Sequence, residues 1–360
     1  MRDSSGNEGA PPTTGPRPAP NGASGAPAVA GRPTMVDVAR AAGTSTALVS
    51  IVMRGVPGAS DATRQRVMRI AREMGYVPDQ RARKLRQSHS RVIGVTFELQ
   101  QPFHGDLVEN MYIAAAGHDY EIMLSAVAPS RNEKVAVDAL LRERCAAMVL
   151  LGSTLDADGL AVLAEGVPLI VVARRTEACG VGVVRGDDLA GITLAVDHLV
   201  GMGHRRIAHI DGADAPGSED RRKGFLAAMR NHGLRNSAVV LAGGLTENAG
   251  ARAATELLGQ KRPPTAIVAF NDRQATGVLD VLVRRGLRVP EDVSVIGYDD
   301  SRLAKIPHVQ MTTISQDAQE MARVALLDAL ALIAGQPAQE RVLTPTLVER
   351  STTGPVSIIG

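Results

Sequence analysis

Residues 34–55 read TMVDVARAAGTSTALVSIVMRG, and this stretch decides the fold of the N-terminal part of the chain. It predicts two short helices separated by a break at residues 42–45. Thr34 and Ser45 are placed to cap the two helices with their hydroxyl groups. Gly43 favours the left-handed backbone that ends the first helix. Because neither helix is long enough to be stable alone, the stretch needs a further partner.

A third helix supplies that partner. It is expected to begin after Ser60, at the end of the loop GVPGAS, and to end near residues 74–75. Apolar residues recur at helical spacing in all three segments. Three amphipathic helices of this kind bury their apolar stripes against one another. The sequence therefore predicts a small all-α domain over residues 34–77.

The composition bounds the class of protein. A chain of 360 residues with 44% hydrophobic residues has room for two or three domains with proper cores. It has no run of uncharged apolar residues long enough to span a membrane and no secretory signal, so we expect a cytosolic protein. Two cysteines, Cys145 and Cys179, exclude a disulfide framework and a cysteine-rich metal site. We expect no cofactor and no bound metal.

The charge of the chain is unevenly distributed. Residues 34–91 contain 11 Lys and Arg against 4 Asp and Glu, although the whole chain has a formal net charge of +2. The remainder of the chain is therefore acidic. A small cationic module joined to an acidic body indicates a polyanionic partner for the module. The alternative is a solvated charged face without a partner.

The segments that flank the small domain differ from it in composition. Residues 1–33 are rich in Gly, Pro, Ala, Ser and Thr and are expected to be a disordered extension. Residues 78–90 begin with PDQRARKLRQ, a cationic candidate for a fourth short helix whose one large apolar residue is Leu85. At the other end of the chain, residues 351–360 are expected to form a tail.

From residue 91 the pattern changes to alternating strands and helices. Buried strands are predicted for six apolar runs rich in β-branched residues: VIGVTF, AAMVLLG, PLIVVAR, RIAHIDG, TAIVAFND and VSVIGYDD. Helical patterns such as LAGITLAVDHLVGMG and RRKGFLAAMRNHG separate them. This alternation predicts parallel sheets with helices on both faces. At least six strands over roughly 270 residues favour two α/β lobes.

Several of these motifs, taken in order, resemble the lactose-repressor (LacI/GalR) family. The resemblance is carried by TMVDVARAAGTSTALVSIVMRGVPGASDATRQRVMRIAREMGYVPDQRARKLR, HLVGMGHRRIAHIDG, RRKGFLAAM, AFNDRQATG, VPEDVSVIGYDD and TTISQD. It implies a helix-turn-helix DNA-binding domain over residues 34–77, a hinge helix and linker over 78–90, and a periplasmic-binding-protein-like effector and dimerisation domain over 91–350. The implied first lobe comprises about residues 91–185 and 315–335. The implied second lobe comprises about residues 186–312 and 341–350, and the chain crosses between the lobes three times.

The resemblance also implies which residues read DNA. The second helix of a helix-turn-helix enters the major groove, and the positions that match the family's base-reading residues are Thr46, Ala47 and Ile51. Ile51 cannot make the bidentate contact to guanine that an Arg makes, so we expect it to contact thymine methyl groups. The alternative is that Ile51 is a core residue. Arg54 is expected to supply charge to a base or a phosphate.

Other residues of the DNA-binding region are expected to contact the backbone or the minor groove. Hydroxyl groups at or near helix starts suit phosphate oxygens, and they belong to Thr34, Ser45, Ser50, Ser60 and Thr63. In the hinge helix, Arg81 adds attraction that carries no sequence information. Ala82 is small enough for two such helices to pack closely. Leu85 aligns with the leucine that wedges into the central base step and kinks the duplex.

In the effector domain, the matching motifs imply a ligand cleft between the lobes. Its expected residues are Phe103, Arg221, Asn271, Asp299 and Gln316. Several of them follow strands, where open α/β sheets bind ligands. Asp272 is expected to cap its helix instead. The chain has Ala173 where relatives often have an Asp, so one expected acceptor for a ligand hydroxyl is absent.

The resemblance implies a transcriptional regulator, expected to be a repressor, that binds a pseudopalindromic operator as a homodimer. A small-molecule effector, for which a sugar is one candidate, would shift the operator-competent state through its different affinity for two conformations. One alternative is a ligand-binding module that has lost specific DNA readout. An enzyme is the other alternative, but GVGVVRG is a poor match to a dinucleotide fingerprint, and the chain has no Walker-type loop or GxSxG elbow.

Overall fold

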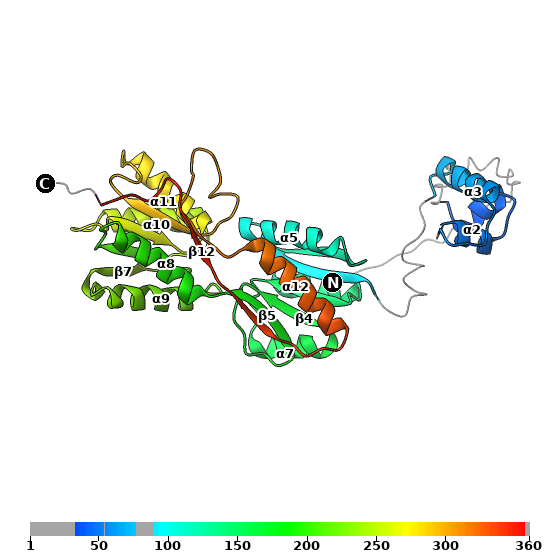
Figure 1. Ribbon diagram of the computed structural model, residues 1–360, viewed down its shortest axis with the longest axis horizontal. Coiled ribbons are helices and arrows are strands. Elements are labelled where there is room, and N and C mark those ends of the chain that lie inside the picture. Colours follow the sequence, from blue (N-terminus) through cyan, green and yellow to red (C-terminus); the bar gives the residue numbers. More distant parts are fainter. Residues whose placement is uncertain (1–32, 54, 77–89, 357–360) are drawn as a thin grey trace, which may run out of the picture. The chain divides into compact units, whose positions relative to one another are not determined.

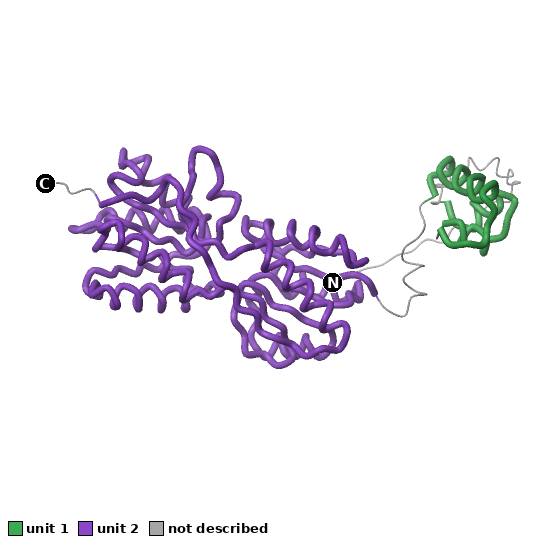
Figure 2. The backbone as a smooth tube through the Cα atoms, in the orientation of Figure 1, with its two compact units in different colours: residues 1–86 green, residues 87–360 purple. Residues whose placement is uncertain are grey.

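The computed structural model describes residues 33–53, 55–76 and 90–356. The chain divides into two compact units, Met1–Arg86 and Gln87–Gly360 (Figure 2). The expected extension over 1–33 and the expected hinge helix over 78–90 therefore lie almost entirely outside the described residues.

The described part of the first unit contains the three predicted helices. They are α1 (Met35–Ala41), α2 (Thr46–Met53) and α3 (Asp61–Glu73). Thr34 caps α1, and its hydroxyl accepts a hydrogen bond from the backbone N–H of Asp37. Ser60 caps α3 in the same manner. The apolar stripes meet in one core that consists of Val38, Ala39, Ala42, Val49, Val52, Val67 and Ala71. The predicted all-α fold of this unit is confirmed.

The second unit contains two six-stranded sheets, and each sheet forms the centre of a lobe (Figure 1). In order across the first sheet, the strands are β11 (Glu340–Leu343), β5 (Val181–Gly186), β4 (Leu169–Val172), β3 (Ala147–Leu151), β1 (Val92–Glu98) and β2 (Glu121–Val127). All of its neighbouring strands are parallel. The helices of this lobe are α5 (Pro102–Ala115), α6 (Glu133–Arg142), α7 (Ala157–Gly166) and α12 (Ala318–Ile333).

The second sheet is parallel except for one edge strand. Its strands, in order, are β12 (Thr346–Val348), β10 (Thr313–Ser315), β9 (Ser294–Asp299), β8 (Ala266–Ala269), β6 (Ile207–Ile210) and β7 (Ala238–Leu241). β12 is antiparallel to β10. The helices are α8 (Asp188–Gly201), α9 (Ser218–Asn231), the short 3₁₀ helix η1 (Arg235–Ser237), α10 (Glu247–Leu258) and α11 (Asp272–Arg284). All six apolar runs quoted from the sequence are strands, so the predicted α/β architecture is confirmed.

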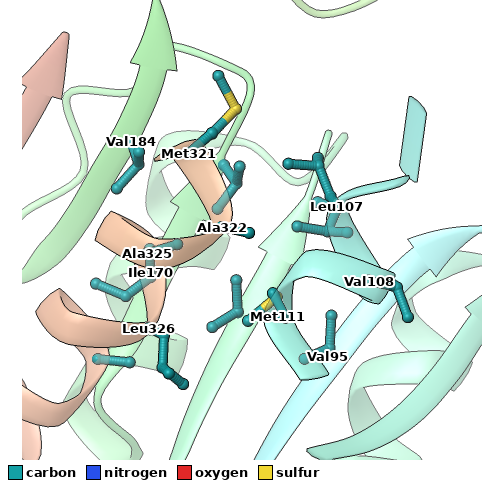
Figure 3. Packing of buried hydrophobic residues seen from close by; sticks show 14 of the residues in the cluster. Val95, Leu107, Val108, Met111, Ile170, Val184, Met321, Ala322, Ala325 and Leu326 are labelled. Carbon is teal, nitrogen blue, oxygen red and sulfur yellow. The ribbon is translucent and has the colours of Figure 1, made fainter. Parts of the chain in front are cut away.

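Both faces of each sheet are buried by helices. In the first lobe, α5 and α12 pack on one face, where Met111 and Leu326 meet the sheet residues Val95 and Ile170 (Figure 3). Alternate residues of the same strands point to the other face, toward α6 and α7, and form a second cluster. This alternation explains why the strands read as continuous apolar runs.

The chain passes between the two lobes at three places. They lie between β5 and α8, between β10 and α12, and between β11 and β12. The third crossing differs from the expected lobe bounds, which assign all of residues 341–350 to the second lobe. Residues 340–343 pair with β5 in the first sheet, and residues 346–348 pair with β10 in the second. The physical reason is that β5 was left with an open edge that a short polar strand can cover.

Candidate functional site

The second helix of the first unit, α2, presents one face that does not belong to the core. Thr46 and Ala47 are exposed on it, and Ser50 and Ile51 are half-buried. These positions are spaced so that they share one side of the helix. Val49 and Val52 lie on the other side, in the core. The structure therefore brings the three predicted base-reading residues and Ser50 onto one accessible surface.

Ile51 is not a member of the core cluster of this unit. Its side chain leans toward the loop that follows α2, since a Cβ atom added at Gly58 would lie 3.4 Å from Ile51 Cγ2. The side chain is therefore only partly covered by its own unit. This placement favours an accessible contact residue over the alternative of a core residue.

Of the hydroxyl residues predicted to contact phosphates, Thr34, Ser45, Ser60 and Thr63 lie at helix starts, whereas Ser50 lies in the middle of α2. Ser45 Oγ accepts a hydrogen bond of 3.2 Å from the backbone N–H of Leu48. Ser60 Oγ accepts one of 3.3 Å from the backbone N–H of Thr63 and lies 2.9 Å from the Thr63 hydroxyl. Thr34 completes a reciprocal capping box with Asp37. Four other predicted DNA-contact residues lie outside the described residues: Arg54, Arg81, Ala82 and Leu85.

In the second unit, a pocket of about 110 Å³ lies between the two lobes. All five predicted effector-contact residues line it: Phe103, Arg221, Asn271, Asp299 and Gln316. Phe103 comes from the first turn of α5 in the first lobe. Arg221, Asn271 and Asp299 come from the second lobe, and Gln316 comes from the crossing segment after β10. Residues more than 200 positions apart thus meet in one pocket, because the carboxyl ends of parallel strands in both lobes face the same space.

Arg221 is the most constrained cation of the pocket. Its Nε donates a 2.8 Å hydrogen bond to the Asp188 carboxylate, and its Nη1 donates one of 2.6 Å to the carbonyl of Phe270. Its guanidinium also stacks 3.5 Å from the centre of the Tyr298 ring. Both members of the Arg221–Asp188 pair are nearly fully buried. The ion pair holds the guanidinium of Arg221 in place and offsets its positive charge. One edge of the guanidinium faces the pocket, while the Arg221–Asp188 pair as a whole has no net charge.

Asp299 reaches the pocket from a strained turn. It ends β9 with φ of 114°, and the next residue, Asp300, has φ of 51°. Both values lie in the left-handed region that side-chain-bearing residues avoid, and such strain concentrates at functional sites. Asp299 Oδ1 accepts a 2.8 Å hydrogen bond from Gln316 Nε2. Burial raises the pKa of Asp299 well above its ordinary value, with Arg221 opposing and Asp272 adding to the rise.

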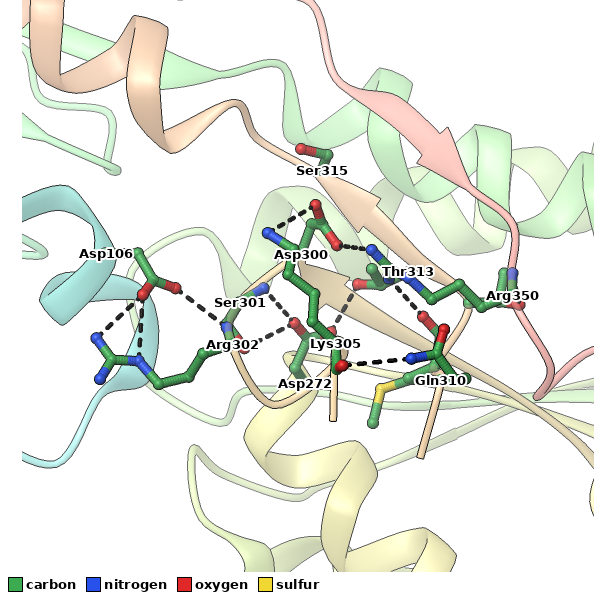
Figure 4. A network of polar contacts seen from close by, with 12 residues as sticks. Asp106, Asp272, Asp300, Ser301, Arg302, Lys305, Gln310, Thr313, Ser315 and Arg350 are labelled. Atoms are coloured by element: carbon green, nitrogen blue, oxygen red, sulfur yellow. Dashed lines mark hydrogen bonds and ion pairs between the residues drawn. The ribbon is translucent and has the colours of Figure 1, made fainter. Parts of the chain in front are cut away.

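A polar network behind the pocket holds this turn in place (Figure 4). Asp272 accepts hydrogen bonds from the backbone N–H and hydroxyl of Ser301, at 2.7 and 2.9 Å, and from the Thr313 hydroxyl at 2.6 Å. Arg350 and Lys305 both pair with Asp300. The network therefore fixes the backbone on the side of Asp299 that faces away from the pocket.

The expectation that Asp272 caps its helix is wrong. The N-cap of α11 is Asn271, whose Oδ1 accepts a 2.7 Å hydrogen bond from the backbone N–H of Gln274. Asn271 Nδ2 lies 3.4 Å from the Leu245 carbonyl. Asp272 lies one residue later and points to the sheet side, where three donors converge on it. Asn271, which was predicted to contact the ligand, is therefore also the helix cap. Asp272, which was predicted to be the cap, instead anchors Ser301 and Thr313.

Several further pocket residues follow strand ends but were not identified from the sequence. They include Glu98, Gln101, His104, Gly152, Thr154, Ala215, Pro216, Leu245 and Phe270. His104 accepts a 3.0 Å hydrogen bond at Nδ1 from the backbone N–H of Glu98, and burial lowers its pKa to about 4. The signal that would have found them is their position alone, since β1, β3, β6, β7 and β8 end at or a few residues before them. Ala173, where an Asp was expected, also lines the pocket.

The electrostatics of the pocket suit an uncharged polar ligand. Arg221 is neutralised by Asp188. Burial raises the pKa of both Glu98 and Asp299, which disfavours their charged forms. The arrangement offers hydrogen-bond donors and acceptors without a strong net charge, between the aromatic side chains of Phe103 and Phe270.

Neither a metal site nor a single membrane-spanning helix occurs in the described part of the chain. No group of three or more His, Cys, Asp and Glu residues there could hold a metal ion. No single helix there is long and apolar enough to cross a membrane. Only the pair α1 and α2 has the combined length and composition, and that pair is bent by 105° at its break.

Comparison with known proteins finds matches to both units. Residues 34–79 match the profile of the bacterial regulatory proteins of the lacI family, and residues 196–353 match the periplasmic binding protein-like domain. The HTH-type transcriptional repressor CytR of Escherichia coli (strain K12) is 33% identical over 327 residues, which are 89% of this chain and 96% of that protein.

Solved structures agree with these matches. A LacI transcriptional regulator from a Rhodococcus species is 66% identical, with a TM-score of 0.73 that covers 74% of this chain and 99% of that one. The lac repressor dimer bound to operator and the anti-inducer ONPF is 27% identical, with a TM-score of 0.76 over 89% of this chain and 99% of that one. Its two kinds of domain are those built above from the sequence. The chain belongs to the LacI family of bacterial regulatory proteins and is a DNA-binding transcriptional regulator.

Proposed function

We propose that this regulator is a repressor that binds a pseudopalindromic operator as a homodimer and responds to an uncharged, oxygen-rich effector such as a sugar. The observation that carries the effector part is the pocket lined from both lobes by Phe103, Arg221 and Asp299. A ligand held there contacts both lobes at once, so its affinity depends on their relative arrangement. Such a difference in affinity is what a conformational switch requires.

We further propose that α2 reads the operator. Thr46, Ala47 and Ile51 share its accessible face, and Ala47 and Ile51 offer apolar groups that suit thymine methyls. The capping hydroxyls at Ser45 and Ser60 lie where phosphate oxygens approach helix starts. The hinge residues Arg81, Ala82 and Leu85 lie outside the described residues. From the sequence resemblance we propose that Arg81 adds charge, that Ala82 lets two hinge helices pack closely, and that Leu85 wedges into the minor groove.

The regulatory role also makes an enzyme an unfavourable interpretation. The relatives found are transcriptional regulators, and we assign no catalytic residue to the pocket.

The lac repressor structure provides the model for assembly, because it contains a dimer on its operator. Since the chromosome is the partner, we place the action of the protein in the cytoplasm.

The test is selection of bound fragments from randomised duplex DNA, with and without a panel of neutral sugars and nucleosides. We expect a symmetric site with A·T pairs opposite Ile51, and we expect one class of ligand to change the recovered amount. Recovery of no enriched sequence at low salt would contradict DNA readout. Enrichment that no ligand changes would contradict the effector role while leaving DNA binding intact.

A further inference from the structure

His104 lies in the first turn of α5 and lines the cleft pocket from the first lobe. It is not among the pocket residues that the sequence resemblance identified. Two independent contacts of its ring determine what the ring can do. The inference drawn from them rests on the proposed effector pocket.

The first contact fixes the position of the ring proton. His104 Nδ1 lies 3.0 Å from the backbone nitrogen of Glu98, whose N–H donates to it. A ring nitrogen that accepts a hydrogen bond carries no proton. Because burial lowers the pKa of His104 to about 4, the ring is neutral at neutral pH and has a single proton. That proton is therefore on Nε2.

The second contact places the Nε2 edge of the ring. A Cβ atom added at Gly152 would lie 2.9 Å from both Nε2 and Cε1 of His104, and Gly152 itself has φ of +57°. The ring edge thus lies directly over a backbone position that only glycine fills without strain. Gly152 also lines the pocket. Among the described residues, none accepts a hydrogen bond from His104 Nε2, and the residue lines the pocket.

We propose that His104 is a specificity residue of the cleft pocket, and that its Nε2–H group donates a hydrogen bond to an oxygen atom of the effector. A hydroxyl or carbonyl oxygen satisfies this donor. An ammonium or amide N–H at the same position places two donors against each other and leaves both unsatisfied, which opposes binding. The residue therefore selects the orientation of an oxygen-rich ligand on the first-lobe side.

Two substitutions separate the roles of the two ring nitrogens. In His104→Asn, the side-chain oxygen replaces Nδ1 as acceptor for the Glu98 N–H, and the distal donor is lost. In His104→Gln, the terminal amide nitrogen replaces the Nε2 donor, and the Nδ1 acceptor is lost. Thermal unfolding without ligand reports whether each variant is folded. Asn271→Ala serves as a positive control for loss of a pocket contact from the second lobe.

Binding is measured by calorimetry on the full-length protein with glucose, galactose, ribose and cellobiose, and with the matched amino sugars glucosamine and galactosamine. We expect a neutral sugar to bind the wild type, to bind His104→Gln within a few-fold, and to bind His104→Asn roughly five- to a hundred-fold more weakly. Equal binding by wild type and His104→Asn overturns the role of His104 and leaves the effector pocket standing. Failure of every probe to bind the wild type counts against the proposed pocket, and the inference falls with it.

Nuclear magnetic resonance of the imidazole nitrogens gives a readout that does not depend on any variant being folded. In the wild type at pH 7, we expect the His104 spectrum of a neutral ring protonated at Nε2. Addition of the binding sugar should make the Nε2–H proton visible by slowing its exchange with water. A ring protonated at Nδ1, or an Nε2–H signal unchanged by a sugar that binds, would overturn the inference.

Discussion

At the scale of single residues, the buried carboxyl group of Asp272 predicts a measurable dependence of stability on pH. Three donors from Ser301 and Thr313 converge on it. Burial nevertheless raises the pKa of Asp272 to about 7, against the opposing effect of those hydrogen bonds. In the unfolded chain the group has its ordinary pKa near 3.8. The folded protein therefore holds the proton more tightly than the unfolded chain does.

This difference predicts that stability falls as pH rises. Between pH 4 and about 7 the folded state binds more protons at Asp272 than the unfolded state. The free energy of unfolding should therefore decrease with pH in that window, by at most about 1.4 kcal/mol per pH unit from this group. In Asp272→Asn the contribution disappears. Urea unfolding at pH 5, 6 and 7, followed by circular dichroism, measures the difference in slope between wild type and variant.

The matched control is Asp292→Asn. The Asp292 carboxylate pairs with Arg288, and that contact lowers the pKa of Asp292 to about 2. It is ionised in both states above pH 5, so its removal should leave the slope unchanged. Parallel pH profiles for wild type and Asp272→Asn would show that the buried carboxyl group does not titrate in this window.

The candidate site was only partly predictable at this scale. The family resemblance identified Arg221, Asn271 and Gln316, because each lies in a motif that matches the family. His104 follows β1 but belongs to none of those motifs, and its contact with Gly152 comes from a different part of the chain. Asp272 was misread because Asn271 and Asp272 are both good capping residues, and only the backbone conformation decides which of them caps.

At the scale of elements, helix caps decide the stability of the DNA-binding unit. Its helices are short, and their caps satisfy backbone N–H groups that have no partner within the helix. Ser60→Ala removes the acceptor for the Thr63 N–H and should destabilise this unit by about 1 kcal/mol. Hydrogen exchange of the α3 amides measures the loss. Ser60→Asp preserves an acceptor at the cap, so it should retain most of the protection. Equal loss in both variants would show that the hydroxyl has another role.

The accessible face of α2 leads to a prediction about DNA. Ile51→Ala removes apolar surface that is only partly covered within the unit. We expect affinity for the fragment selected by the wild type to fall by roughly 1 kcal/mol, because a contact with a thymine methyl is lost. Binding to unrelated DNA should not change, since it depends on phosphate contacts. Gel-shift titrations on both duplexes test this expectation, and an equal loss on both would assign Ile51 to the folding of the unit.

Six of the twelve strands in the described residues were predicted from their apolar runs, and β11 shows why an edge strand was not. The strands buried on both faces have continuous apolar patterns, as β3 and β4 show. β11, with the sequence ERVL, is largely exposed at the sheet edge and has no such pattern. Its pairing with β5 depends on the direction in which the chain leaves α12, which is a tertiary effect. The assignment of residues 340–343 to a lobe therefore required the structure.

At the scale of the second unit as a whole, one ion pair joins the lobes near the crossing segments. Asp106 of α5 accepts hydrogen bonds of 3.2 Å from both the backbone N–H and the Nε of Arg302, which lies in the second lobe (Figure 4). Arg302 immediately follows Ser301, which Asp272 anchors. The contact therefore connects the first lobe to the rigid turn that presents Asp299 to the pocket. It is specific to the arrangement of lobes seen here.

Loss of this pair should shift the equilibrium between lobe arrangements. Arg302 is 61% exposed at its side chain and Asp106 is 21% exposed, so the contribution is of the order of 0.2–1 kcal/mol, or roughly 1.4- to 5-fold in population. Fluorescent labels at Val162→Cys and Val283→Cys, one exposed position on each lobe, report the separation after both native cysteines are replaced. We expect Asp106→Asn, Arg302→Gln and the double variant to shift the distribution equally, because each removes the same ion pair and leaves the backbone N–H of residue 302 able to donate to residue 106. High salt should move the wild type toward the variants and leave the variants unchanged. A double variant that differs from both single variants would show that the two residues act on the lobes independently.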